Sequence, residues 1–300
     1  MTSVFIDGAA GTTGLEIRER LAGRAEFTWI ELDDARRKDP AARREALNDA
    51  DVAILCLPDD AAREAVALVA DGTTRIIDAS TAHRVAEGWT YGFPELEPDG
   101  AERVAAARFV SNPGCYPTGF LALVRPLIRA ELLSESTLLS VNATSGYSGG
   151  GKAMIAEFET GATPAFRPYA LALAHKHVPE MTRHAGLANP PVFQPAVANT
   201  FRGMVVEVPL HAAPDGALDA LAEAYAGSSV VRVARDEVTT VAIEDDAGTD
   251  RMTLRVFANR DTRQARLVAT LDNLGKGAAG AAVQNLNLMA GVDATAGLTL

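Results

Sequence analysis

The sequence predicts an α/β protein of two domains: an N-terminal doubly wound parallel sheet and a second α+β domain with a mixed or antiparallel sheet. Three observations carry this prediction. Short apolar strands alternate with helical segments over the first hundred residues, a glycine-rich loop follows the first strand, and beyond about residue 138 the strands alternate apolar and polar side chains. A chain of 300 residues is long enough to form two hydrophobic cores.

The first domain is expected to consist of parallel β-α-β units. Apolar runs predict four strands, at Ser3–Asp7, Phe27–Leu32, Val52–Leu57 and Arg75–Asp78. Helical spacing between them predicts helices at Gly14–Leu21, Pro40–Leu47 and Asp59–Val69.

The second domain follows a different plan. Alternation of apolar and polar residues predicts strands at Met204–Val208, Arg251–Phe257 and Arg266–Leu271. Segments rich in Pro, Asn and Gly predict loops at Gly186–Pro195 and Ala212–Gly216, and helical spacing predicts a last helix at Lys276–Met289.

A glycine-rich loop joins the first predicted strand to the first helix. Gly8, Gly11 and Gly14 follow the spacing G-x-x-G-x-x-G, with Thr12 and Thr13 between the last two glycines. Such a loop lets the backbone approach a pyrophosphate, which then rests on the helix N-terminus. The strand, loop and helix in this order favour a Rossmann-type dinucleotide site over a plain glycine turn.

Charged residues after the second predicted strand bear on which dinucleotide is bound. An acid within Glu31 to Asp34 could hydrogen-bond a ribose, whereas Arg36, Arg37 and Lys38 could hold a 2′-phosphate. The cations favour NADP over NAD. A solvated charged loop is the alternative interpretation.

Cys115 is the residue most typical of covalent catalysis. It lies between the chain-reversing pair Pro113-Gly114 and a helix start predicted at Pro117. Backbone N–H groups and the positive end of the helix dipole lower the pKa of a thiol there and can receive an oxyanion formed when the sulfur attacks a carbonyl. We interpret Cys115 as a nucleophile, with a buried structural cysteine as the alternative, and Cys56, in an apolar strand, as a core residue.

A histidine-rich segment could supply the base that this nucleophile needs. His175 and His177 lie close together before Glu180, and imidazole titrates near neutral pH. Spacing does not decide which ring faces Cys115; we favour His177, with His175 second. A zinc site, for which the segment offers no second ligand cluster, and an incidental surface pair are the alternatives, and no metal is expected.

Composition argues against several classes of partner and location. The net charge of -11 argues against nucleic acid, whose phosphates require a basic surface. No basic leader and no apolar run long enough to cross a bilayer is visible, so neither secretion nor membrane binding is expected. The chain has only two cysteines, one interpreted as structural (Cys56) and one as reactive (Cys115). This argues against a disulfide framework and favours the reducing cytoplasm.

Together, the cysteine motif, the glycine loop and the histidine segment resemble the short-form N-acetyl-γ-glutamyl-phosphate reductase family of arginine biosynthesis. The resemblance runs nearly end to end, and the cysteine motif is its specific part. The matching segments are residues 7–14, 78–84, 91–95, 110–119, 145–152, 175–180, 193–197, 273–280 and 284–285.

This resemblance implies a Rossmann domain at residues 1–113, completed by a returning C-terminal helix within residues 273–300, and a catalytic and dimerisation domain at residues 114–272. It implies reduction of an acyl phosphate by NADPH to a semialdehyde, through a thioester on Cys115, in a homodimer or homotetramer.

Further site residues are expected in the matched segments. Arg84, Asn112, Lys152 and Glu180 are expected to bind the substrate, and Gly277 and Asn285 to lie on the nicotinamide side. A structural ion pair is the alternative role for Arg84, and a helix start or a capping residue is the alternative for Gly277 and Asn285.

Two other functions stay open on the sequence alone. Aspartate-semialdehyde dehydrogenase and aminoadipyl-phosphate reductase share the thioester chemistry and differ in substrate. A nucleotide-sensing regulatory protein that kept the Rossmann fold and lost catalysis is the non-enzyme alternative; an intact Cys115 with two histidines argues against it.

Overall fold

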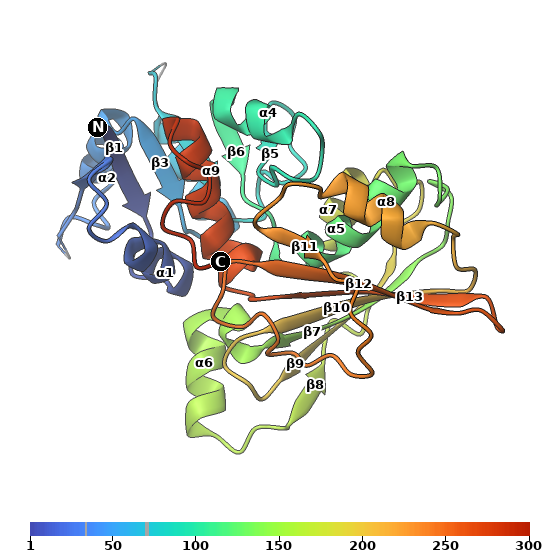
Figure 1. The fold of residues 1–300 in the computed structure, drawn as a ribbon. Helices are drawn as coiled ribbons and strands as arrows, with labels where there is room; N and C mark the ends of the chain where they lie inside the picture. The colour runs from blue at the N-terminus through green and yellow to red at the C-terminus, as the bar shows by residue number, and fades with distance from the viewer. Residues whose placement is uncertain (34, 70–71) are drawn as a thin grey trace. The chain divides into compact units, whose positions relative to one another are not determined.

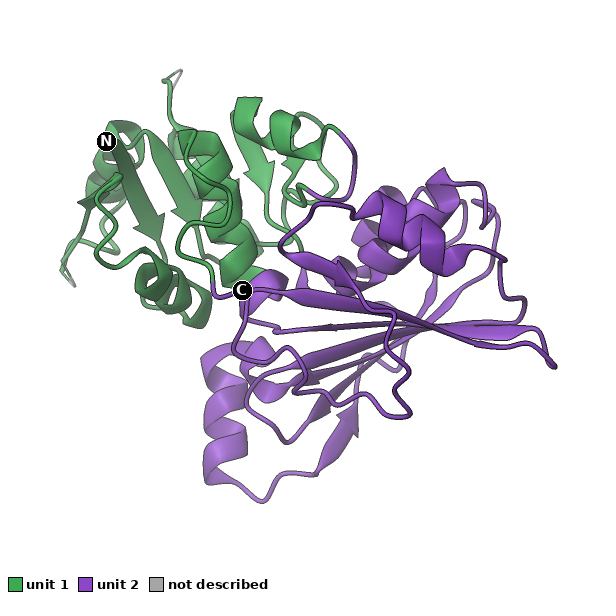
Figure 2. Ribbon diagram, viewed as in Figure 1, with its two compact units in different colours: residues 1–94, 99–113, 278–298 green, residues 95–98, 114–277, 299–300 purple. Residues whose placement is uncertain are grey.

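Two separate β-sheets organise the chain in a computed structural model, which describes residues 1–33, 35–69 and 72–300 (Figure 1). The chain divides into two units, coloured in Figure 2. Unit 1 comprises residues 1–94, 99–113 and 278–298, and unit 2 comprises residues 95–98, 114–277 and 299–300. The predicted fold class, a parallel α/β sheet followed by a mixed sheet, is confirmed.

Unit 1 holds the parallel sheet. Its elements are β1 (Thr2–Asp7), α1 (Thr12–Leu21), β2 (Phe27–Ile30), α2 (Pro40–Asp49), β3 (Val52–Leu55), α3 (Asp59–Leu68), β4 (Arg75–Asp78), β5 (Thr90–Tyr91), α4 (Gly100–Ala106), β6 (Phe109–Ser111) and α9 (Gly280–Ala290). The strand order is β2-β1-β3-β4-β6-β5 and every pairing is parallel. The winding direction reverses between β1 and β3, and open α/β sheets bind ligands at the carboxyl ends of the strands at such a point.

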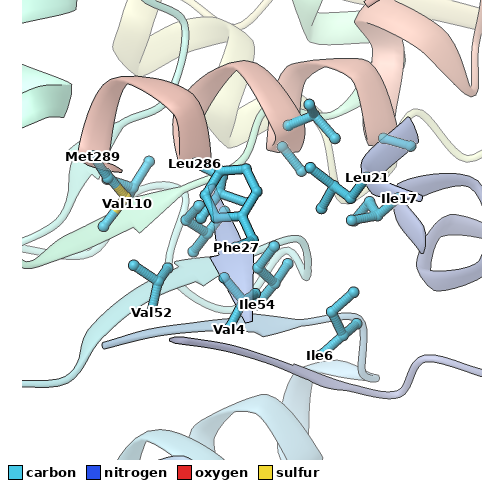
Figure 3. Close-up of a cluster of buried hydrophobic side chains, with 14 of the residues drawn as sticks. Val4, Ile6, Ile17, Leu21, Phe27, Val52, Ile54, Val110, Leu286 and Met289 are labelled. Carbon is cyan, nitrogen blue, oxygen red and sulfur yellow. The ribbon is translucent and has the colours of Figure 1, made fainter. Parts of the chain in front are cut away.

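Both faces of this sheet are buried under helices, which is why its strands read as continuous apolar runs. Along β1, Val4 and Ile6 point into one hydrophobic cluster and Phe5 into the other. Figure 3 shows the first cluster, where Leu286 of α9 and Ile17 of α1 pack over the strands. The predicted return of the C-terminal helix to the Rossmann sheet is therefore confirmed.

Unit 2 holds the mixed sheet. Its elements are α5 (Cys115–Arg129), β7 (Ser140–Gly146), α6 (Gly151–Thr160), β8 (Phe166–Pro168), α7 (Val178–Ala185), β9 (Val192–Ala198), β10 (Met204–Leu210), α8 (Ala217–Ala224), β11 (Val231–Val233), β12 (Met252–Asn259) and β13 (Gln264–Leu271). A 3₁₀ turn (Tyr147–Gly150) precedes α6, and a π-helical turn (Gly275–Ala279) precedes α9.

The second sheet has the order β11-β12-β13-β10-β7-β9-β8. The β11–β12 and β7–β9 pairs are parallel and the others are antiparallel. Helix α5 packs directly on its central strands, because Gly119 has no side chain: a Cβ at this position would lie 2.7 Å from Cγ2 of Val206 on β10. The sheet therefore supports the helix that begins at Cys115.

Two local predictions were wrong. The segment 186–195 was predicted as loop, but β9 occupies 192–198, where Pro195 pairs with Ala143 of β7. Helix α5 begins at Cys115 and not at Pro117, because a proline is tolerated throughout the first turn, where its missing N–H has no intrahelical acceptor.

In the described residues, no helix combines the length and the apolar character needed to cross a bilayer.

Leu286 offers a test of the unit 1 core. It is fully buried between α9 and the sheet, so Leu286→Ala should lower the free energy of unfolding of this unit by about 2–5 kcal/mol. Both tryptophans of the chain, Trp29 and Trp89, lie in unit 1, so urea unfolding followed by tryptophan fluorescence reports on this unit.

The matched control is Leu15→Ala on α1, since this leucine is half exposed and its truncation should cost much less. Equal urea concentrations at the unfolding midpoints of the two variants would contradict the packing described for α9.

Candidate functional site

Cys115 is the first residue of α5, directly after the N-cap residue Gly114. The N-cap residue is a glycine and therefore has no side chain that could cap the helix N-terminus. Cys115 forms no disulfide bond with the other described cysteine, Cys56, and is partly exposed. A thiol at this position faces the positive end of the helix dipole, and the first-turn N–H groups are suitable donors to an oxyanion.

A buried carboxylate ties the start of α7 to the start of α5. The Gly114 N–H donates to Oε1 of Glu180 at 2.8 Å, and only 2% of Glu180 is exposed. Glu180 lies in the first turn of α7, whose N-cap residue is His177. The bond therefore brings the histidine segment next to the cysteine motif, two parts of the sequence that are far apart.

The two histidines have different surroundings. His177 is buried, and its backbone N–H donates to Nδ1 of His175 at 3.1 Å. Burial, and to a smaller extent the Lys176 charge, lower the pKa of His175 to about 4. His175 is therefore neutral at physiological pH, and its Nδ1 is already occupied as an acceptor.

Two tyrosines complete the surroundings of the cysteine. The Tyr116 hydroxyl donates to the Ala196 carbonyl at 3.0 Å, and the Tyr169 hydroxyl donates to that of Tyr116 at 3.3 Å. The His175 ring packs edge-on against both tyrosines. Burial raises the pKa of Tyr169 to about 12, with a smaller contribution from Cys115, and also raises that of Tyr116. Both phenols therefore stay protonated hydrogen-bond donors.

Gly277 lies against the nucleophile. A Cβ at Gly277 would be 2.9 Å from Cβ of Cys115, and the Gly277 N–H donates to the Asp272 carbonyl at 3.0 Å. The Asp272 carboxylate accepts hydrogen bonds from the backbone N–H groups of Leu274 and Gly275. This segment holds the backbone in place beside Cys115, where a side chain would not fit.

The segment that follows β7 is hydrogen-bonded to the segment that begins at Asp272. Asn273 donates to the Ser148 hydroxyl at 2.9 Å and accepts from the Gly203 N–H at 3.0 Å. Lys152 follows in the first turn of α6 and its side chain is exposed. Sequence reasoning missed Arg202, which lies in the loop before β10, 3.5 Å from the Asp272 carboxylate.

The glycine loop of unit 1 has the geometry that a pyrophosphate site needs. Gly8 has a φ of +88° and any Cβ there would collide with the Cys56 carbonyl, while a Cβ at Gly14 would lie 2.7 Å from Cα of Ala9. Gly11 is the N-cap residue of α1 and has no side chain that could cap the helix, and Thr12 and Thr13 lie in the first turn. A cavity of about 520 Å³ adjoins this loop and the ends of β1 and β2.

Cations gather around this cavity. Arg18, Arg37, Lys38 and Arg43 line it together with Asp7 and Glu31. Arg36, which the sequence placed in the cofactor site, is exposed and pairs with Glu45 at 3.0 Å. Glu31 pairs with Arg18 at 2.9 Å. The Asp33 carboxylate accepts from the Ala35 and Arg36 N–H groups, and Asp34 lies outside the described residues.

Asn112 and Asn285 form a buried amide pair in unit 1. Nδ2 of Asn285 donates to Oδ1 of Asn112 at 3.1 Å and to the Gly92 carbonyl at 2.9 Å. Among the described residues, no group donates to the buried Oδ1 of Asn285. A nicotinamide carboxamide is a donor that fits this acceptor. The Arg84 guanidinium donates to the carbonyls of Asn112 and Ala79 and is almost fully buried, so these bonds hold it against the backbone.

The described residues contain no cluster of three or more His, Cys, Asp or Glu side chains that could hold a metal ion.

Comparison with known proteins gives matches over both parts of the chain. The semialdehyde dehydrogenase NAD binding domain family matches residues 28–104, and the semialdehyde dehydrogenase dimerisation domain family matches residues 115–273. Proteins named N-acetyl-gamma-glutamyl-phosphate reductase are 50% identical to this chain. The one from Trichormus variabilis matches over 98% of both chains, and the one from Chelativorans sp. over 95% of this chain and 97% of its own.

Solved structures share the fold at low sequence identity. A probable aspartate-semialdehyde dehydrogenase from Pseudomonas aeruginosa has a TM-score of 0.75 and 17% identity, covering 96% of this chain and 98% of that chain. Aspartate semialdehyde dehydrogenase II from Vibrio cholerae has a TM-score of 0.72 at 17% identity, over 96% of this chain and 98% of that chain.

His175 should stay neutral well below the ordinary imidazole range. Burial lowers its pKa to about 4, so the unfolded chain takes up a proton on this ring at a higher pH than the folded chain does. The resulting stabilisation is complete above about pH 6.5 and is lost as the pH falls toward 4. NMR titration of the imidazole resonances should show that the His175 signal does not titrate between pH 7 and 5.

The variant His175→Asn assigns that resonance by its disappearance, since the Asn carbonyl can still accept the His177 N–H. A His175 signal that titrates near pH 6.5 would contradict the described burial.

Proposed function

The chain belongs to the N-acetyl-gamma-glutamyl-phosphate reductases of the semialdehyde dehydrogenase family, and from that membership we propose that it reduces N-acetyl-γ-glutamyl phosphate to N-acetylglutamate 5-semialdehyde with NADPH, in arginine biosynthesis. One observation carries the proposed mechanism: Cys115 begins a helix whose N-cap residue, Gly114, has no capping side chain, and the Glu180–Gly114 bond holds the histidine segment beside it.

The first step forms a thioester. The Cys115 thiolate attacks the acyl carbon, and the carbonyl oxygen becomes an oxyanion facing the first-turn N–H groups of α5. Collapse of this intermediate breaks the carbon–oxygen bond to phosphate, which leaves as inorganic phosphate, and leaves the acyl group on sulfur.

The second step releases the semialdehyde. NADPH, when bound, supplies a hydride to the thioester carbon. The same N–H groups receive the oxyanion again, and its collapse expels the Cys115 thiolate and yields the aldehyde.

His177 is the better candidate for the base that forms the thiolate. Nδ1 of His175 already accepts a hydrogen bond, and a pKa of about 4 makes its ring a weak base at neutral pH. We therefore assign His175 a positioning role toward His177, by the bond to its backbone N–H. Glu180 has a positioning role toward Cys115, because its carboxylate accepts the N–H of the preceding residue, Gly114.

The cofactor proposal rests on unit 1. The glycine loop admits a pyrophosphate, and Arg37 and Lys38 line the adjoining cavity where a 2′-phosphate would need cations. Glu31 and Asp33, which could otherwise accept from a ribose hydroxyl, are bound to Arg18 and to backbone N–H groups. These contacts support NADP over NAD.

Assembly and location are inferred from the family. We propose a homodimer or homotetramer formed through the domain at residues 114–272, which contains all but the last residue of the matched dimerisation domain, and a cytoplasmic location. We likewise propose that residues 1–113 with 273–300 form the NADP-binding domain.

The activity is tested with purified protein in the phosphate-dependent oxidation direction. N-acetylglutamate semialdehyde should reduce NADP far faster than aspartate semialdehyde does, and Cys115→Ala should abolish the reaction because no thioester can form. A preference for aspartate semialdehyde would agree with the thioester mechanism but would refute the proposed substrate. Inactivity with both semialdehydes would favour the nucleotide-sensing regulatory protein.

The cofactor assignment is tested by removing cavity cations. The double variant Arg37→Ala/Lys38→Ala should raise KM for NADPH by at least roughly tenfold, about 1.4 kcal/mol, and leave KM for NADH unchanged. Arg36→Ala is the matched control, since Arg36 has the same charge but pairs with Glu45. An equal loss with Arg36→Ala, or with NADH, would refute a 2′-phosphate site at Arg37 and Lys38.

A further inference from the structure

We propose that unit 2 binds a small multivalent oxyanion, a phosphate or a polycarboxylate, in a cavity lined by three arginines. The cavity has a volume of about 340 Å³. Its lining includes Arg232, Arg251, Arg255, Thr253, Asp245 and Asp246. None of these residues belongs to the site described around Cys115 or to the unit 1 cavity, so the proposal does not rest on the proposed function.

The register of β11 and β12 places the three arginines on one face of the sheet. Side chains alternate between the two faces along a strand, so Arg251 and Arg255 point to the same side as Thr253 between them. Arg232 of β11 is paired in register with Thr253 and therefore points to that side as well. Leu254 points to the opposite side and is fully buried in the core.

The segment between β11 and β12 lies over this face and completes the cavity. Val238 and Thr240 of this segment are part of the lining. Asp246 ties the segment to the sheet, since its buried carboxylate accepts from the hydroxyl groups of Thr253 at 3.2 Å and Thr270 at 2.6 Å. Contacts within one chain therefore hold the cavity in shape, and the charge of Asp246 is shared by two hydroxyl donors.

Buried nitrogen atoms of the arginines supply the hydrogen-bond donors for an anion. Among the residues that the structure describes, no group accepts from Nε of Arg251 or from Nε and Nη1 of Arg255. Only 12% of the Arg255 side chain is exposed. Buried charged donors without a partner are costly to a folded protein. Water accepts such hydrogen bonds, whereas an oxyanion also balances the guanidinium charge.

The other acids near the arginines balance this charge only in part. Asp236 accepts one long hydrogen bond, of 3.5 Å, from Nη2 of Arg255, and its contact with Nε at 3.4 Å is not a hydrogen bond. The same carboxylate lies 4.0 Å from Nη2 of Arg232. Asp245 is exposed and accepts from the Ala242 N–H at 3.3 Å. The planar donor array of arginine matches both phosphate and carboxylate, which gives the class of ligand.

Isothermal titration calorimetry tests the proposal with two probes, inorganic phosphate and citrate, at one fixed ionic strength. Arg255→Met removes two of the unpartnered nitrogens and should raise Kd at least about tenfold, whereas Arg255→Lys should keep part of the affinity. The matched control is Arg235→Met, because Arg235 pairs with Asp219 at 2.7 Å on the surface. An effect with phosphate alone assigns a phosphate site, and an effect with citrate alone assigns a polycarboxylate site.

Two further measurements locate the bound anion and check the fold of the variant. The anion should slow hydrogen exchange in residues 231–256 of the wild-type chain and not in those of Arg255→Met. In anion-free buffer, Arg255→Met should unfold at the wild-type temperature or above it, because the substitution removes buried donors that lack a partner. Arg251→Met repeats the binding test with an independent substitution.

Equal Kd values for the wild-type chain and Arg255→Met would overturn the proposal, and so would an equal loss of affinity in Arg235→Met. If neither probe binds and Arg255→Met weakens self-association in sedimentation, an acidic side chain of a second copy occupies the cavity, and the proposal is overturned as well. None of these measurements uses catalytic activity, so failure of the proposed function would leave their outcomes unchanged.

Discussion

The hydrogen bond between the Gly114 N–H and the Glu180 carboxylate is the contact on which the proposed chemistry depends. It is short, buried and charge-assisted, the kind of hydrogen bond that proteins lose only at a high energetic cost. Because Cys115 follows Gly114 at the start of α5 and His177 is the N-cap residue of α7, this one bond links the helix that carries the proposed nucleophile to the helix that begins at the proposed base.

Buried hydrogen-bond acceptors hold the backbone around Cys115, in addition to the packing of α5 on its sheet. Asp272 binds three backbone N–H groups and Asn273 links Gly203 to Ser148, so that Gly277 can lie against Cys115 with no side chain between them. Buried polar networks of this kind specify one geometry when every member is satisfied. A larger residue at Gly277 would have to displace either the nucleophile or the segment that begins at Asp272.

Local chemistry makes part of this arrangement predictable from the sequence. The glycine spacing, the proline-rich entry into α5 and the histidine segment act over a few residues, so the sequence alone indicates the pyrophosphate loop, Cys115 and the histidine pair. Contacts between distant segments cannot be predicted in this way. Nothing in the spacing shows that Arg36 binds Glu45 while Arg37 and Lys38 line the cavity, or that the Arg84 guanidinium is held by backbone carbonyls. Arg202 gives no signal, because its surroundings come from β7 and from the segment after β13.

The acidic balance of the chain is compatible with the proposed anionic cofactor because cations line the unit 1 cavity in which we propose that it binds. Four cations and two acids line the unit 1 cavity, although the whole chain carries a net charge of -11. Over distances beyond about 8–10 Å, physiological salt screens the acidic surface, whereas cations close to a bound phosphate act almost unscreened. Local placement of a few arginines and lysines therefore decides anion binding, and the net charge does not.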